Sequence, residues 1–387
     1  MAQGTAQVLS VMPHTRTFMS TEHDALQRQL TEIHNHTRVQ EAARIAELRL
    51  DTNGYLQPGG RGQNFRFTTP AFAKFCQLLA PGLYPLLDSV SGQIRVPGEA
   101  AGAYSFAEAV QLYNTVLSCR YATRVNGRAR FIWNTRERLL EGVFGSRYRY
   151  MPNTEIFELA ELTRTLGNRP LQFNGAALLG RRLLLRYMQQ APVFSVTLPD
   201  GVTHHYTGGM YAHNSELGGE TSVRLATLLC CMDTPLSAMT SFEGTRLSHA
   251  GKDFKARVRS TLSQVILRLD GLRTLRTNMQ TMARTSLNLP SNSLQAAGAL
   301  RISRYLRSQG LTAGAAKAVV RGAMYHGSEL APQKGLETLV PQRVIAARTF
   351  YDLFVSLMRE AQRFSVNSRE ALEQAAYALL ERPTDIG

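Results

Sequence analysis

The chain has 387 residues, with 44 Lys and Arg against 29 Asp and Glu, a formal charge of +15 and a hydrophobic content of 44%. This apolar content is enough for a sizeable core and excludes a chain that is disordered throughout. No run of about 18 apolar residues occurs, and the first residues lack the basic and apolar regions of a secretory signal. We therefore expect neither a membrane-spanning helix nor a signal peptide.

The positive charge comes almost entirely from arginine, with 39 Arg against five Lys. Arginine presents a planar fork that binds phosphate through two hydrogen bonds and stacks on flat rings. This bias favours nucleic acid as a partner. Codon usage in a GC-rich genome explains the same bias, and the two explanations are compatible.

Four cysteines are too few for the disulfide framework of a secreted chain of this length. Cys230 and Cys231 are adjacent within an apolar run, where free cysteine behaves as a small hydrophobic residue. These features indicate a reducing, cytoplasmic compartment.

The first third of the chain reads as helices joined by loops. A loose arm, 1–19, precedes a helix that is predicted from Ser20 to about Leu50 and stopped by Asp51 to Gly54. A Gly-rich linker follows at 58–62, and further helices are predicted at 69–80 and 105–120.

The middle of the chain has the pattern of strands. Asn126-Gly127 favours a two-residue hairpin turn, and short apolar runs bounded by Gly, Pro and Asp continue to about residue 232 around a helix at 154–167. The chain reads as helical again from about residue 250. The predicted fold class is α+β, a central curved antiparallel sheet flanked by helices with a helical C-terminal region. We expect three regions. Residues 1–64 form an N-terminal arm and helix, residues 65–250 form the α+β core with the antiparallel sheet, and residues 251–387 form the helical C-terminal region.

Common enzyme motifs are missing from the sequence. Gly251-Lys252 is followed by Asp253 and lacks the upstream Gly of a phosphate-binding loop, and no GxGxxG, HExxH or GxSxG is found. We therefore expect a non-catalytic protein without a cofactor.

No metal site is expected either, because no spacing of Cys and His matches a zinc motif. His204 and His205 are adjacent in a predicted strand and should point to opposite faces. His213, Cys230, Cys231 and His249 are further Cys and His residues of the types that bind zinc, and their spacing matches no zinc motif.

The acidic residues leave one further alternative open. A nuclease needs clustered carboxylates to hold a divalent metal. Glu216 and Glu220, in the loop NSELGGE, are the best acidic pair for this purpose. A metal-dependent nuclease that uses them is thus an alternative function.

Residues 120–150 carry the strongest local signal, because eight Arg alternate there with aromatic residues that include the only Trp. Single strands are bound by cationic grooves along the phosphates and by aromatic platforms for bases, at about 1–3 kcal/mol per stacked base. Arg147 and Arg149 should share one side of a strand, and Tyr148 and Tyr150 the other. The predicted contacts in this stretch are Arg124, Arg128, Arg130 and the Arg147–Arg149 pair for phosphates, and Trp133, Tyr148 and Tyr150 for bases. The alternative, that the aromatic residues face the core and the arginines are merely solvated, stays open.

A second basic stretch follows at the start of the helical C-terminal region. On a helix, Lys252, Lys255 and Arg259 line one side and add to the predicted nucleic-acid interface. A solvated amphipathic face explains this pattern equally well.

Several short motifs resemble, in order, those of the phage/plasmid-like family known as domain of unknown function 932. They are Ser146-Arg147-Tyr148, Asn153, Asn214-Ser215-Glu216-Leu217-Gly218, Cys231 and His249, and the resemblance covers roughly residues 65–382. One departure is that Cys231 is followed by Met232-Asp233-Thr234, where the family usually has Asn-Gly. The resemblance supplies no activity to carry over, but its phage and plasmid setting implies replication or recombination.

Charge, aromatic residues and resemblance together predict a cytoplasmic single-stranded DNA-binding protein of phage or plasmid type. The expectation extends to strand annealing and to homo-oligomers built through the apolar C-terminal helices. The leading alternative is a phage structural or interaction protein whose basic face meets an acidic protein or packaged DNA.

Overall fold

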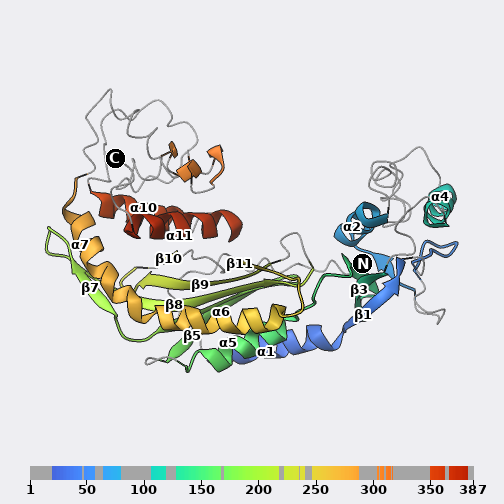
Figure 1. Cartoon of the computed structure of the whole chain (residues 1–387), viewed down its shortest axis with the longest axis horizontal. Coiled ribbons are helices and arrows are strands. Elements are labelled where there is room, and N and C mark those ends of the chain that lie inside the picture. The colour runs from blue at the N-terminus through green and yellow to red at the C-terminus, as the bar shows by residue number, and fades with distance from the viewer. Residues whose placement is uncertain are drawn as a thin grey trace.

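A computed structural model of the chain shows an elongated α+β molecule with two sheets (Figure 1). It describes residues 20–45, 48–56, 64–79, 106–118, 128–166, 170–217, 222–234, 236–239, 246–286, 349–361 and 366–381, with short pieces between 303 and 316. The predicted fold class is confirmed, since a mainly antiparallel sheet is flanked by helices and further helices follow it. Among the described helices, none is long and apolar enough to cross a membrane.

The smaller sheet has four strands in the order β1-β3-β4-β2. Their bounds are β1 Thr37–Arg44, β2 Arg66–Phe67, β3 Arg128–Asn134 and β4 Leu139–Gly145. β3 and β4 form an antiparallel hairpin, and β2 pairs parallel to β4. Helix α2 (Thr69–Leu79) packs on β4, and α4 (Phe106–Ser118) completes an aromatic core in which Phe67, Phe72 and Tyr113 are almost fully buried.

The larger sheet has the strand order β10-β9-β8-β6-β5, with β11 beside β9 and β7 beside β8. The strands are β5 Leu171–Leu179, β6 Arg182–Gln189, β7 Phe194–Thr197, β8 Thr203–Ser215, β9 Ser222–Cys231, β10 Ser237–Met239 and β11 Arg246–Ser248. β6 shows strict alternation of buried and partly exposed residues, whereas nearly all of β8 and β9 is buried. The two long strands therefore have both faces covered.

Helices lie on both faces of the larger sheet (Figure 1). On one face are α1 Ser20–Asn35, α5 Asn153–Thr163 and α6 Phe254–Arg268, and after the short 3-10 helix η4 Asp270–Thr274, α7 Leu275–Arg284 runs past the end of the sheet toward the other face. On the other face are α10 Phe350–Ala361 and α11 Val366–Glu381. One hydrophobic core contains residues from α1, the sheet and α11, including Leu26, Leu225 and Leu372.

The predicted helix from Ser20 to Leu50 is too long, because α1 ends at Asn35 and the chain continues as β1. Gln40 to Ala43 have reasonable helix propensity, but β1 pairs antiparallel with β3 on both sides of an irregularity between Gln40 and Ala43, and tertiary pairing outweighs local preference. Before residue 64, α1 therefore packs into the core of the larger sheet and β1 belongs to the smaller sheet, and the described helices after residue 251 share the core of the larger sheet. The described strands from β3 to β9 belong to two sheets, where one was expected.

Candidate nucleic-acid interface

Motif residues that are far apart in the sequence meet where the two sheets adjoin. The Tyr148 hydroxyl donates to the backbone oxygen of Glu216 at 2.6 Å. The Asn214 side chain donates to Asn153 Oδ1 at 2.8 Å and to the backbone oxygen of Met151 at 3.1 Å. Tyr148, Asn153, Asn214 and Glu216, which belong to the motifs of the family resemblance, thus meet in one buried junction, whereas Cys231 lies at the other end of β9.

Arg181 ties this junction to both sheets. Its guanidinium pairs with Glu141 of β4 and with Glu216 Oε2 at 3.4 Å, and it donates to Thr37 Oγ1 of β1 at 2.6 Å. Burial raises the pKa of the Glu216 carboxyl, although the backbone N–H of Asn153 and the Arg181 charge act in the opposite direction. Both Arg181 and Glu216 are largely shielded from solvent, so they serve the packing of the junction.

Four rings form a continuous stack across the junction. Phe144 lies on Tyr148 with ring centres 4.0 Å apart, and the Tyr148 ring lies on His249 at 5.1 Å with planes only 3° apart. The far side of His249 contacts Phe254 at 4.8 Å. The ring stack therefore links β4 of the smaller sheet to the segment between β11 and α6.

His249 is neutral in this environment. Burial lowers the pKa of its imidazole to about 4, even though a hydrogen bond to the Arg149 backbone oxygen favours the charged form. The Nδ1 atom lies 2.9 Å from that oxygen, which as a carbonyl can only accept, so Nδ1 carries the proton. The ring is a packing element with a fixed tautomer.

Beside the ring stack is a cavity of about 510 Å³ with a basic rim. It is lined by residues of α2, β3, β4 and β11 and of the segments that follow β1, β4 and β11, namely Ile45, Lys74, Leu78, Arg128, Ala129, Phe144, Gly145, Ser146, Arg147, Tyr148, Ser248, His249 and Ala250. Lys74, Arg128 and Arg147 are exposed, and no acidic residue is among the described residues of the lining. We call this the junction cavity. Its volume is within the range of small-molecule sites, and its charge suits an anion.

Two of the predicted phosphate contacts, Arg128 and Arg147, lie together on this rim. Arg149 is half-buried next to them in sequence. The second basic stretch begins just beyond the cavity, with Lys252, Lys255 and Arg259 all exposed on or before α6. Lys255 is engaged in an exposed ion pair with Glu155 at 2.7 Å.

Three of the predicted contacts have side chains that are buried and therefore not placed to meet a ligand. Trp133 is 1% exposed, packs its ring against Phe65 and Phe131, and donates to Gln40. The Tyr148 ring is stacked between Phe144 and His249, so neither of its faces is free to stack on a base. Arg130 is 5% exposed, pairs with Glu41 at 2.9 Å and donates to the backbone oxygen of Tyr148.

Tyr150 is also poorly suited to stack on a base, because it is half-buried and packs against the Phe144 and Tyr148 cluster. Arg124 and Glu220 lie outside the described residues. Glu216 accepts the backbone N–H of Asn153 and pairs with Arg181, so its carboxylate is already used within the junction. The predicted pairing of Glu216 with Glu220 at a nuclease metal site therefore has no support from the described residues.

Sequence reasoning missed Lys74 and Arg181. Lys74 lies in a predicted helix whose apolar pattern drew attention to the core, and its place on the rim depends on how α2 docks on β4. Its rarity, as one of five Lys in an Arg-rich chain, was the only available signal.

No protein-family model matches the chain, and searches of curated proteins and of solved structures return no match.

Proposed function

We propose that this protein binds nucleic acid through the phosphate backbone at the junction cavity, with single-stranded DNA as the favoured ligand. The observation that carries the proposal is the convergence of Lys74, Arg128 and Arg147 on one cavity with no acidic residue in its described lining. Cations that neutralise phosphates release condensed counterions, which supplies most of the sequence-independent affinity for nucleic acid.

The dimensions of the cavity favour an unpaired strand. A volume of about 510 Å³ accommodates a ligand of nucleotide size. A paired strand holds its phosphates on the outside of a stiff helix, whereas a flexible single strand can bend a nucleotide into a partly open recess of this size. This argument replaces the aromatic platforms that the sequence predicted, since Trp133 and Tyr148 are buried.

The exposed basic residues of α6 extend the proposed path. Lys252 follows Ala250 of the cavity wall by two residues, and Arg259 lies further along the helix. A strand that leaves the cavity over this helix would meet further cations. The rest of the proposal is a phage- or plasmid-type role in a reducing cytoplasm, in which self-association promotes strand annealing.

The test is fluorescence anisotropy with labelled single-stranded DNA, double-stranded DNA and RNA, each titrated at several salt concentrations. Single-stranded DNA should bind most tightly, and affinity should fall steeply as salt rises. The charge reversals Arg128→Glu and Arg147→Glu, made together, should weaken binding at least about tenfold. They should also reduce the slope of log K against log salt by about 1.4, at about 0.7 per lost phosphate contact.

A matched control is the double reversal Arg273→Glu and Arg276→Glu, which changes net charge equally. Both residues are exposed on η4 and α7, elements that contribute nothing to the described lining of the cavity. The affinity of this control variant for single-stranded DNA should stay within about twofold of that of the unmodified protein. Equal losses of affinity in both double variants would mean that DNA is bound by the positive charge of the whole surface and not by the junction cavity. Binding that does not respond to salt would remove the phosphate contacts and favour the interaction-protein alternative.

A further inference from the structure

A second cluster of chemically reactive side chains lies at the far end of β8 from Glu216. His204 is in β8, Cys231 ends β9, and Asp233 follows two residues later. β8 and β9 are antiparallel, with Tyr206 opposite Cys231. Continuing this register places His204 opposite Asp233, and residues two apart on a strand share a face. His204 and Cys231 therefore lie on one face of the sheet, and Asp233, just beyond the end of β9, lies beside them at the sheet's edge.

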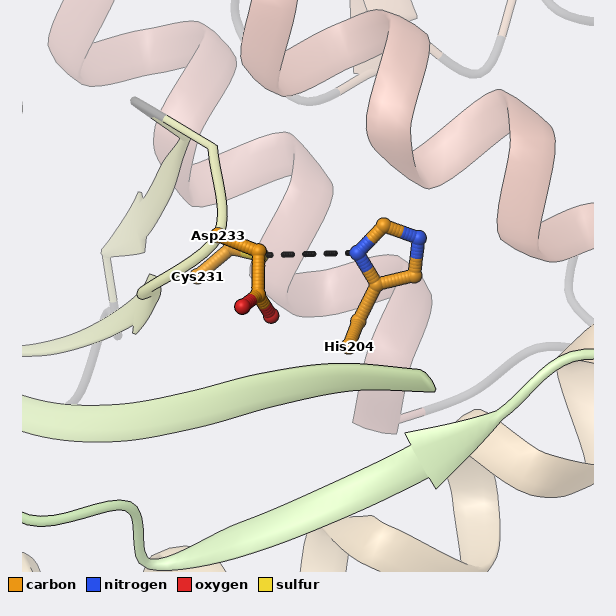
Figure 2. Close-up of side chains that lie close together, drawn as sticks. All are labelled: His204, Cys231 and Asp233. Atoms are coloured by element: carbon orange, nitrogen blue, oxygen red, sulfur yellow. Dashed lines mark hydrogen bonds between the residues drawn. The ribbon is translucent and has the colours of Figure 1, made fainter. Parts of the chain in front are cut away.

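The three possible ligand atoms are close enough to share one ion. They lie within 4.8 Å of one another, and Cys231 Sγ is 3.9 Å from His204 Nδ1 (Figure 2). Zinc bonds of about 2.3 Å to sulfur and 2.0–2.1 Å to nitrogen, at a tetrahedral angle, place these two atoms about 3.6 Å apart. Small side-chain adjustments are enough to reach that geometry.

The surroundings hold the carboxylate in place. The backbone N–H of His205 donates to Asp233 Oδ2 at 2.5 Å, and the His205 ring nitrogen Nδ1 lies 3.3 Å from both carboxylate oxygens. Such outer contacts orient ligands in known metal sites. Cys231 is buried while Asp233 is exposed, so the cluster opens to solvent on the side of the carboxylate.

The adjacent cysteine faces the other way. Cys230 packs with Tyr211 and Met239 on the opposite face of the sheet, in a separate hydrophobic cluster. Only Cys231 can therefore join His204, which distinguishes the two thiols of the Cys-Cys pair.

We propose that His204, Cys231 and Asp233 bind one Zn²⁺ ion, with water in the fourth position. One nitrogen, one thiolate and one carboxylate form a borderline-soft donor set that suits zinc better than magnesium or calcium. The ring of Tyr351 in α10 lies 6.2 Å from the His204 ring, so the ion would bind at the edge where the C-terminal helices meet the sheet. This site is independent of the junction cavity and of the proposed function.

The test uses full-length, reduced, metal-free protein. It is titrated with Co²⁺ while the absorption spectrum is recorded and, separately, with Co²⁺ and with Zn²⁺ in a calorimeter. We expect one ion per chain and a thiolate-to-cobalt charge-transfer band. Zn²⁺ should displace Co²⁺ and raise the melting temperature, since an ion that binds only the folded state stabilises it. A titration without a thiolate band, or without saturable binding at one ion per chain, overturns the proposal.

Variants identify the ligands. Cys231→Ser should abolish the thiolate band, and His204→Ala should weaken Zn²⁺ binding by more than the 10- to 100-fold that loss of an outer contact costs. Asp233→Asn keeps the shape of an exposed side chain and should weaken binding without unfolding the protein, which circular dichroism checks. Cys230→Ala is the matched control and should retain the band. A band that survives in Cys231→Ser but is lost in Cys230→Ala contradicts the assignment.

Discussion

The guanidinium of Arg186 in β6 meets the carboxylate of Glu373 in α11 at 3.0 Å, across 187 residues of sequence. Arg369 Nε and Ser237 Oγ donate to the same carboxylate at 3.1 Å and 2.8 Å. Burial alone would raise the pKa of the Glu373 carboxyl, but the two guanidinium groups hold it below its ordinary value. This buried network fixes α11 on the sheet.

The Glu373→Gln variant tests the network. It removes the negative charge that faces two buried guanidinium groups, so the free energy of unfolding should fall by about 3–5 kcal/mol. Urea denaturation followed by circular dichroism measures the loss. As a control, Glu32→Gln breaks the exposed pair with Arg136 and should cost less than about 1 kcal/mol. Similar losses in both variants would mean that the buried network contributes no more than a surface pair.

His249 gives the stability a pH dependence with a definite sign. The folded imidazole has a pKa of about 4, below the 6.5 of the unfolded chain, so between these values the unfolded state binds more protons. The free energy of unfolding should therefore fall as pH drops from 6.5 to 4, by up to about 3 kcal/mol from this residue. His249→Phe keeps a ring in the stack but cannot titrate, and should flatten the profile in this window. A profile with the same slope in both proteins would place the pH dependence elsewhere.

Trp133 is a built-in reporter, because it is the only Trp in the chain and is 1% exposed. Its fluorescence should resist acrylamide in the folded protein and should not change when a saturating oligonucleotide is added. Trp133→Phe should bind single-stranded DNA with unchanged affinity while losing stability, since the smaller ring leaves a cavity. Strong quenching by bound DNA would restore the base-stacking role that the sequence suggested.

Gly209 lies in the centre of the larger sheet, where no side chain fits. A Cβ added there would lie 2.5 Å from the backbone oxygen of Tyr187, and the strand cannot move away because β6 and β9 flank it. Gly209→Ala should destabilise the protein by about 1–3 kcal/mol through overpacking. Gly145→Ala, also in a strand, meets no atom of any described residue within 4 Å and should be close to neutral. Thermal melts of the two variants decide between backbone crowding and a general cost of replacing strand glycines.

The fold class could be predicted because its signals are local. Short apolar runs separated by Gly, Pro and Asp turns correspond to β5 through β9, and the helix predicted at 154–167 is α5. The end of α1 could not be predicted in this way, because β1 exists only through its pairing with β3, about 90 residues later in the sequence. Pairing partners at such separation leave no trace in local periodicity.

The candidate site was predicted only in part, for a related reason. Alternation along β3 separates Arg130 from Phe131 and Trp133, and a sheet with one solvated face would expose one of these sets. Here the helices cover one face and the junction with the larger sheet covers the other, so both sets are buried. Arg128 and Arg147 are exposed because they lie at strand ends, where the coverage stops. From the sequence, His204 and Cys231 are candidate metal ligands that no spacing motif supports, and Asp233 is not among the candidates, because strand register, and not sequence spacing, brings His204 to Cys231.

The ring stack has a consequence for how the molecule comes apart. Phe144 belongs to the smaller sheet, while His249 and Phe254 belong to the segment that leads from the larger sheet into α6. Separating the sheets would strip both faces of Tyr148 and uncover the Arg181 pairs at the same time. The two sheets should therefore melt as one cooperative unit, and the cavity between them exists only while both halves are folded.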